Sequence, residues 1–527
     1  MTASSVARVS HPSLGRLRSG SKPTLGVVAL CLALGGLSLL LPYTLSGDEW
    51  CWLIWGREVG RLALDTTACT VWKPLPVLFT TVISPAGDAA PMLWLLLVRT
   101  SWLLALVLAY RVGTRLGGRP AGLVAALGLL LIPNPNADWI SYFRHGSSEP
   151  LIVALILAAV DRHLAAHRLQ ALGLAGLAAL GRPEAWVIVL AYGALVWRTD
   201  PGRRLTTVAV VAAVPLVWLG GGLWGGRGPL SAGHKPPVTV ANGPERAGAP
   251  RAARPRTYSD KRPVAPGAGS ARKPRGLRYV AAWPLFAGLA VAVTASQIVV
   301  LPIALLALAA LIRAVLALRR NGRSTDRVTA FLGAGVVGWI AVQVTAAVLG
   351  FPVTPRFLFG PAAVISLLGA IGLVETARAL RGKVRVGVTV GLVALIVAFA
   401  IPRVQALPAH LEGADARGDW PSVIAALRRA KGQGALRRCG NTIYAVDIRG
   451  KRAREIAWRL DLPMRAVHRV PSGARVIKPA VVVAEEGGYA ITDAAGTPVG
   501  VDGRRGWQQL ASAGKWLVYA VGCRARG

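Results

Sequence analysis

Long, predominantly apolar runs recur along this sequence and constrain its fold more than any other feature. The first covers residues 25–41, and later examples cover residues 92–110, 205–223 and 386–401. A helix of roughly 20 mostly apolar residues crosses the hydrocarbon core of a bilayer. Hydrophobic residues make up 53% of the chain and charged residues only 16%, which is unusual for a soluble protein. The sequence therefore predicts an α-helical polytopic membrane protein with about 11–12 hydrophobic helices.

The distribution of basic residues predicts how the chain enters the membrane. Residues 1–23 carry four Lys or Arg residues ahead of the first apolar run, and cytoplasmic loops are enriched in such residues. We therefore expect a cytoplasmic N-terminus and an extracytoplasmic loop that begins at Gly47. The first run is too long for a signal-peptide core and lacks a clear small-residue cleavage site, so it is predicted to remain as an anchor. The transmembrane domain is predicted to cover residues 24–403.

The formal net charge of +37 raises the question of a nucleic-acid partner. Most Lys and Arg residues, however, lie at the ends of apolar runs, as the positive-inside rule requires. A further basic cluster lies in the Pro-rich and Gly-rich loop 224–278, which is predicted to be disordered and extracytoplasmic. Its residues 246–278 contain no aromatic side chain except Tyr258 that could stack on a base. We expect attraction to anionic lipid and no nucleic-acid partner.

The composition changes after residue 403, and residues 404–527 are predicted to form a small extracytoplasmic α/β domain. Residues 420–430 have helical spacing, whereas residues 442–446, 476–483 and 516–521 have strand patterns. The domain lacks a nucleotide-binding glycine fingerprint, so no nucleotide cofactor is expected.

The five cysteines show neither a CxxC pair nor metal-ligand spacing. Cys439 and Cys523 bracket the C-terminal region, and Cys51 and Cys69 flank the first outer loop. Disulfides form in oxidising compartments. If both regions face such a compartment, Cys439 with Cys523 is the stronger candidate disulfide and Cys51 with Cys69 the weaker one.

An acidic pair, Asp48 and Glu49, emerges directly after the first apolar run and before a Trp-rich segment. A carboxylate in a cavity at the membrane surface acts as a general base on a hydroxyl group or ligates a divalent cation. The alternative is a solvated acidic turn without a function. We interpret the pair as the candidate catalytic centre and leave open whether it binds a metal ion.

Further charged residues are predicted to share the outer face with this pair. Two short apolar pieces within residues 169–197 suggest a helical hairpin, whose tip carries Arg182 and Glu184. Alternatively, Arg182 and Glu184 form a structural ion pair, and the other residues are ordinary interfacial side chains. Carboxylates beside several cations suit a phosphate-bearing lipid substrate with a hydroxyl acceptor. The candidate substrate-binding residues are Lys73, His145, Glu149, Arg182, Glu184 and Arg356.

The outer-face motifs resemble those of the GT-C superfamily of membrane glycosyltransferases, in particular the actinobacterial type. The resemblance lies in the early acidic pair, in Ser148-Glu149-Pro150, in Leu180-Gly181-Arg182-Pro183-Glu184 and in Pro355-Arg356-Phe357. It implies an inverting transferase that moves a sugar from a polyprenyl-phosphate donor to a hydroxyl of an envelope glycan, lipid or protein on the outer face. It also implies Asp48 as the base, Glu49 as its partner, and Arg182 or Arg356 as contacts of the donor phosphate.

Two other classes of function remain as alternatives. A transporter or flippase for a lipid-linked envelope intermediate predicts charged residues deep in several spans and inverted repeats. The sequence shows few such charges and no obvious repeat. A non-catalytic membrane scaffold that presents the C-terminal domain leaves the acidic pair unexplained. The glycosyltransferase interpretation accounts for more of the outer-face residues than either alternative.

Overall fold

The computed structural model of the 527-residue chain describes most of the two predicted domains. The described residues are 25–41, 43, 45–69, 71–132, 139–226, 277–320, 323–351, 353–405, 420–446, 448, 450–470, 479–485, 489–492, 498–500, 507–514 and 516–523. The predicted basic N-terminus lies outside them, as does nearly all of loop 224–278, so both remain predictions.

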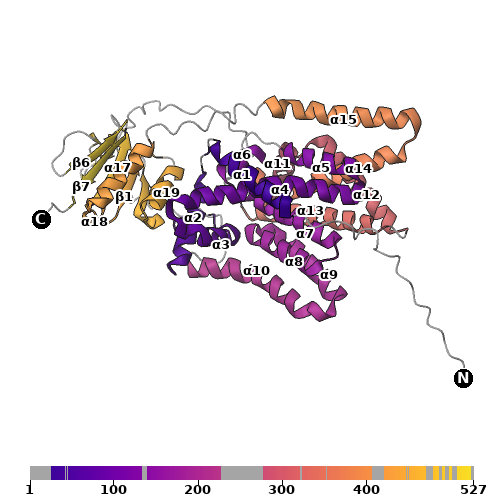
Figure 1. Cartoon of the computed structure of the whole chain (residues 1–527), viewed down its shortest axis with the longest axis horizontal. Coiled ribbons are helices and arrows are strands. Elements are labelled where there is room, and N and C mark those ends of the chain that lie inside the picture. Colours follow the sequence, from indigo (N-terminus) through magenta and orange to yellow (C-terminus); the bar gives the residue numbers. More distant parts are fainter. Residues whose placement is uncertain are drawn as a thin grey trace, which may run out of the picture.

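The described residues up to 405 lie almost entirely in helices, and the strands gather at the C-terminal end (Figure 1). The main helices before residue 200 are α1 (Leu25–Leu37), α2 (Gly47–Gly60), α3 (Pro74–Ile83), α4 (Ala90–Gly117), α5 (Arg119–Leu130), α6 (Trp139–His145), α7 (Glu149–Leu164), α8 (Arg168–Gly181) and α9 (Trp186–Thr199). Those that follow are α10 (Arg204–Trp224), α11 (Leu277–Ile298), α12 (Leu301–Leu318), α13 (Ser324–Val348), α14 (Phe359–Ala379) and α15 (Gly382–Gln405). Short 3-10 helices connect several of them: η2 (Ser38–Leu40), η3 (Ser84–Ala89), η4 (Pro183–Ala185), η5 (Pro201–Arg203) and η6 (Pro355–Leu358).

Several of these helices can cross a bilayer, and the predicted multi-pass membrane architecture is confirmed. Among the described residues, 6 segments are long and apolar enough to do so: Pro74–Gly117, Pro201–Trp224, Leu301–Leu318, Ser324–Val348, Pro355–Ala379 and Gly382–Pro402. Shorter apolar helices accompany them, α5 and α8 included. Helix α14 packs against α4, α5, α7, α12 and α13 and forms the centre of the bundle. Helix α15 lies along the edge of the molecule (Figure 1), and its exposed Val, Leu and Ile side chains suit contact with lipid.

The predicted hairpin within residues 169–197 is confirmed. Helix α8 ends at Gly181, η4 turns the chain, and α9 returns beside α8. Pro183 lacks a backbone N–H and cannot continue α8, which explains the break between the two helices. Charged residues are therefore brought to the hairpin tip.

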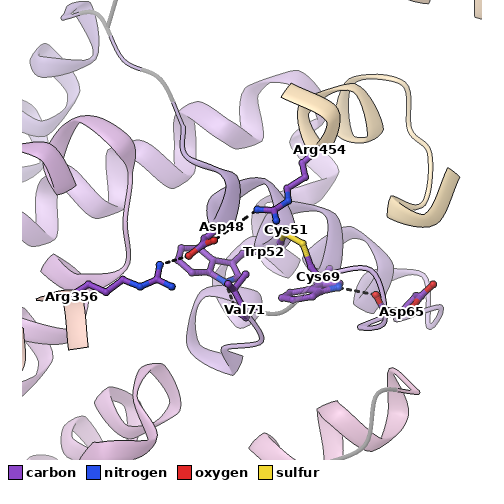
Figure 2. The surroundings of a disulfide bond; sticks show 9 residues. Asp48, Cys51, Trp52, Asp65, Cys69, Val71, Arg356 and Arg454 are labelled. Carbon is purple, nitrogen blue, oxygen red and sulfur yellow. Dashed lines mark hydrogen bonds and ion pairs between the residues drawn. A yellow bond between two sulfur atoms is a disulfide. The ribbon is translucent and has the colours of Figure 1, made fainter. Parts of the chain in front are cut away.

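The loop that begins at Gly47, which is predicted to lie outside, is more ordered than the sequence pattern indicates. The Trp-rich segment after the acidic pair forms α2, and α3 and η3 follow it in a stretch for which no helix is predicted. The Cys51–Cys69 disulfide joins α2 to the segment after it, and Trp55 Nε1 donates a hydrogen bond of 2.8 Å to the Asp65 carbonyl (Figure 2). Gly56 permits close packing of α2 on α3, because a Cβ atom there would overlap Thr80. The loop is thus a packed platform on the membrane domain.

The predicted C-terminal α/β domain is confirmed. Its elements are α17 (Trp420–Gly432), α18 (Ala435–Arg438), β1 (Ile443–Val446), α19 (Gly450–Arg459), η7 (Met464–Ala466), β2 (Val467–Val470), β3 (Ala480–Glu485), β4 (Tyr489–Thr492), β5 (Pro498–Gly500), β6 (Trp507–Ala513) and β7 (Trp516–Val521). The main sheet has the order β2-β1-β3-β7-β6. Strands β2, β1 and β3 are parallel to one another, and β7 is antiparallel to both of its neighbours, β3 and β6. The predicted Cys439–Cys523 disulfide is present.

The C-terminal domain docks on the first outer loop, with α19 packed against α2. The buried Arg57 guanidinium of α2 donates hydrogen bonds to the carbonyls of Trp458 at 3.1 Å and Leu462 at 2.7 Å. Arg61 forms a bidentate pair with Asp461 at 2.8 and 3.1 Å. A buried charge is costly unless it is fully hydrogen-bonded, so the Arg57 contacts fix where α19 sits on α2.

Candidate active site

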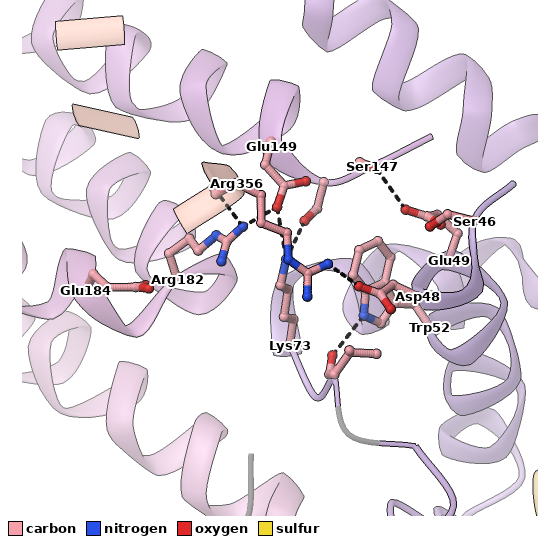
Figure 3. A network of polar contacts seen from close by, with 12 residues as sticks. Ser46, Asp48, Glu49, Trp52, Lys73, Ser147, Glu149, Arg182, Glu184 and Arg356 are labelled. Atoms are coloured by element: carbon pink, nitrogen blue, oxygen red, sulfur yellow. Dashed lines mark hydrogen bonds and ion pairs between the residues drawn. The ribbon is translucent and has the colours of Figure 1, made fainter. Parts of the chain in front are cut away.

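The acidic pair lies in the first turn of α2, where the helix dipole favours negative charge. Glu49 is buried and accepts hydrogen bonds from the hydroxyls of Ser46 and, at 3.1 Å, Ser147 (Figure 3). Burial removes water from this carboxylate, and Asp48 adds a second negative charge. Together they raise the pKa of Glu49 to about 7. Glu49 therefore keeps its proton between about pH 4.5 and pH 7, where an ordinary glutamate is ionised.

Asp48 is more accessible than Glu49 and contacts two cations. Its Oδ2 atom pairs with Nη1 of Arg356, which lies in η6 at the head of α14 (Figure 3). Its Oδ1 atom lies 3.8 Å from Nη1 of Arg454, which lies on α19 of the C-terminal domain (Figure 2). The side chain is 18% exposed, so a small group in solvent can reach it.

Glu149 forms the second half of the cluster, in the first turn of α7. Its Oε1 atom lies 3.3 Å from Lys73 Nζ and also pairs with Arg182 Nη2. Lys73 Nζ donates to Ser148 Oγ at 3.1 Å and stands 5.1 Å from the centre of the Trp52 ring. Burial and the neighbouring cation Arg182 lower the pKa of Lys73 to about 8, against the opposing effect of Glu149. A buried lysine and a buried carboxylate are thus held together.

Arg182 connects the two halves of the cluster. Its Nη2 atom donates a hydrogen bond of 3.1 Å to the Arg356 carbonyl, and its guanidinium lies 4.8 Å from the centre of the Phe357 ring. The hairpin tip, the head of α14 and the first outer loop therefore meet at one point. Of the predicted site residues, the structure joins Asp48, Glu49, Lys73, Glu149, Arg182 and Arg356 in this cluster (Figure 3).

Two predicted site residues, Glu184 and His145, are not part of this cluster. Glu184 accepts a hydrogen bond from Gln343 of α13, whereas Arg182 pairs with Glu149, so the alternative Arg182–Glu184 structural pair is not formed. The Oε2 atom of Glu184 is buried and has no hydrogen-bond partner among the described residues. His145 is half-buried at the end of α6, two residues before Ser147.

An apolar cavity of about 520 Å³ lies beside the cluster, between α7, α8, α9, α13 and α14. Trp339 and Gly360 line its outer end, next to the cluster, because Trp339 Nε1 donates a hydrogen bond of 2.9 Å to the Phe357 carbonyl. The other end of the cavity is lined by Arg168 and Arg327, which lie at or near the start of α8 and α13. The cavity therefore runs along the helices from the charged cluster and has room for an apolar chain.

Sequence reasoning missed two groups of contacts in the site. Arg454 lies more than four hundred residues from Asp48 in the chain, and no local motif marks it. Ser46 and Ser147 are ordinary loop serines whose role as hydrogen-bond donors to Glu49 emerges only in the folded chain. Among the described residues, no group of three or more His, Cys, Asp or Glu side chains is arranged to hold a metal ion.

No protein-family model and no curated protein matches the chain. Its structure is similar to ArnT from Cupriavidus metallidurans in the apo state, with 14% identity, a TM-score of 0.44 and coverage of 95% of this chain and 98% of that chain. It is also similar to ArnT from the same organism bound to undecaprenyl phosphate, with 15% identity, a TM-score of 0.43 and coverage of 95% of this chain and 98% of that chain. A third similar structure is the Archaeoglobus fulgidus oligosaccharyltransferase in the apo form, with 14% identity, a TM-score of 0.41 and coverage of 86% of this chain and 64% of that chain.

Proposed function

We propose that this protein is a membrane glycosyltransferase that moves a sugar from a polyprenyl-phosphate donor to a hydroxyl acceptor on the outer face. The observation that carries the proposal is the convergence of Asp48 with Lys73, Arg182 and Arg356 at the outer end of an apolar cavity. A base, a set of phosphate-binding cations and a space for a lipid chain are the three parts that such a reaction needs. The acceptor is a hydroxyl group of an envelope glycan, lipid or protein.

The cations suit a phosphate leaving group. Arginine binds phosphate oxygens through two parallel N–H donors, and such charge-assisted hydrogen bonds are strong in a partly desolvated site. Lys73 and Arg182 are both buried, so their interaction with an anion is weakly screened. As the bond between the sugar and the phosphate breaks, these cations stabilise the negative charge that develops on the phosphate.

Asp48 is the proposed general base. It accepts the proton of the acceptor hydroxyl while the acceptor oxygen forms a bond to the anomeric carbon. The bond from that carbon to the phosphate oxygen breaks at the same time, and its electron pair leaves with the polyprenyl phosphate. Attack from the face opposite the leaving group inverts the configuration of the sugar. Because Arg356 pairs with Asp48 in the free protein, the donor phosphate is proposed to compete for Arg356 and to release Asp48 Oδ2.

The apolar cavity supports a lipid-linked donor. Its outer end lies beside Phe357, next to Arg182 and Arg356, and its walls run along membrane helices. A phosphate bound to the cations therefore leaves its prenyl chain free to extend into an apolar space. A divalent cation at Asp48 and Glu49 is an alternative means of neutralising the phosphate, and washing membranes with EDTA before the assay decides between the two.

The test is sugar transfer from radiolabelled polyprenyl-phosphate donors in membranes that contain the full-length protein. We expect Asp48→Asn to lower transfer by roughly 10²–10⁴-fold, as the loss of a general base does. Glu49→Gln is expected to keep measurable transfer. Asp200→Asn, which removes a carboxylate at the turn before η5, is the matched control and keeps wild-type transfer.

Two outcomes would count against this function. Full transfer by Asp48→Asn would remove Asp48 as the base. Failure of the wild type with every polyprenyl-phosphate sugar tried, combined with movement of the lipid-linked substrate across vesicles, would favour a flippase. An inverting reaction is checked by the anomeric configuration of the product, and a retained configuration would require a covalent intermediate instead.

A further inference from the structure

Helix α19 brings a cation of the C-terminal domain to the acidic first turn of α2. Arg454 Nη1 lies 3.8 Å from Asp48 Oδ1, while Arg356 of the membrane domain pairs with Asp48 Oδ2 (Figures 2 and 3). Two guanidinium groups from two domains thus approach the two oxygens of one carboxylate. The C-terminal domain is therefore part of the surroundings of the candidate base.

The place that Arg454 occupies is unfavourable for a cation in the absence of Asp48. The N-terminus of a helix carries partial positive charge and repels a guanidinium group. Arg469 of β2 adds a further repulsive charge, and the carboxylates of Asp48 and Glu49 attract the guanidinium. Stability of α2 therefore does not explain why Arg454 lies there, whereas an interaction with Asp48 does.

Two features of the fold hold Arg454 in this position. The hydrogen bonds of Arg57 to the carbonyls of Trp458 and Leu462 dock α19 on α2. Gly47 provides the space, because a Cβ atom at this position would overlap the guanidinium of Arg454. The absence of a side chain at residue 47 thus allows the guanidinium to lie over the start of α2.

We propose that Arg454 is a positioning residue for Asp48 and that the C-terminal domain thereby completes the active centre. The inference rests on the proposed transferase function. When the donor phosphate takes Arg356 away from Oδ2, Arg454 holds Oδ1 and keeps the carboxylate oriented. Oδ2 then faces the acceptor hydroxyl with a free lone pair.

Other charges also face this carboxylate and contribute to its pH dependence. Arg356 of η6 and Lys73 before α3 act as cations, and the neighbouring Glu49 acts as an anion when it is ionised. Removal of Arg454 leaves these groups in place. The change expected from Arg454 is therefore a shift of the pH profile and not its disappearance.

The first test compares Arg454→Gln and Arg454→Lys in nanodiscs, with kcat/KM measured against pH. An opposite charge about 4 Å away favours the ionised carboxylate. We expect Arg454→Gln to move the acidic limb of the profile upward by roughly one pH unit and to lower kcat by roughly 10–100-fold. Arg454→Lys restores part of both. The control is Arg452→Gln on the same helix, whose guanidinium lies 4.5 Å from the centre of the Trp420 ring and away from Asp48.

A second variant tests the same contact from the other side. In Gly47→Ala the new methyl group overlaps the end of the flexible Arg454 side chain. It therefore displaces the Arg454 guanidinium without disturbing the backbone of α2. We expect Gly47→Ala to reproduce the upward shift of the acidic limb. In the double variant with Arg454→Gln, Gly47→Ala is expected to cause little further change. Full additivity of the two changes would contradict the proposal.

A third measurement does not depend on turnover. Carbodiimide labels protonated carboxyl groups, and tandem mass spectrometry that distinguishes Asp48 from Glu49 in their shared peptide gives the pH at which labelling of Asp48 is half-maximal. We expect this pH to be higher in Arg454→Gln than in the wild type. Equal values would overturn the role of Arg454 even if the protein transfers sugar. Conversely, a wild type that transfers no sugar but shows the shift would overturn the proposed function and leave the contact established.

Discussion

At the scale of single residues, the cluster separates two carboxylates that are neighbours in the chain. Asp48 is partly exposed and paired with arginine, whereas Glu49 is buried and hydrogen-bonded to two serines. Burial and the charge of Asp48 raise the pKa of Glu49, so the neutral form is favoured at this second position. Such a division suits a base beside a residue that organises the loop.

Glu49 makes the stability of the protein depend on pH. Its pKa is raised from 4.5 to about 7, so between these values the unfolded chain ionises while the folded chain keeps the proton. Stability is therefore lost as the pH rises from about 4.5 to about 7. Glu49→Gln removes this loss, and its melting temperature should fall less than that of the wild type between pH 5 and pH 8. Parallel melting curves for the two proteins in nanodiscs would show that Glu49 is not buried as a neutral acid.

At the scale of elements, hydropathy and charge predicted much of the architecture but not the contacts. The hairpin α8–α9 follows from two apolar pieces that are too short to cross and from Pro183 between them. The basic residues at the ends of the apolar runs predicted that Asp48, Lys73 and Arg356 lie on the same side of the membrane, and the structure brings these side chains into one cluster. Helix α3, the pairing of Arg182 with Glu149 and the approach of Arg454 depend on tertiary packing. A single sequence carries no local signal for such contacts.

The Cys51–Cys69 disulfide links α2 covalently to the segment that follows it. Its two cysteines are 18 residues apart, and closing a loop of this size contributes about 2–4 kcal/mol. We expect Cys51→Ser with Cys69→Ser to lower the free energy of unfolding by about this amount and to reduce transfer, because Asp48 lies one turn before Cys51. The control is Cys31→Ala, which changes the one cysteine that is free in the described structure. Equal stability of the double variant and the control would show that packing alone holds the loop.

At the scale of the whole molecule, the membrane domain and the C-terminal domain meet at the acidic turn of α2. Arg57 docks the C-terminal domain, Gly47 leaves space for it, and Arg454 reaches Asp48. A site assembled from two domains is competent only while they are docked. If the proposed function holds, displacement of α19 would remove Arg454 from Asp48 and thereby lower sugar transfer.

This coupling can be tested with a pair of arginines on one helix. Arg57 is buried and donates to two backbone carbonyls, whereas Arg61 forms an exposed pair with Asp461. Hydrogen bonds from a charged donor contribute about 1.5–3 kcal/mol each, and exposed ion pairs only about 0–1 kcal/mol. We expect Arg57→Gln to increase hydrogen–deuterium exchange across α19 and to lower transfer at least tenfold. Arg61→Gln should leave both nearly unchanged. If the two variants behave alike, or if exchange rises while transfer stays at the wild-type rate, the C-terminal domain is not required in its docked position.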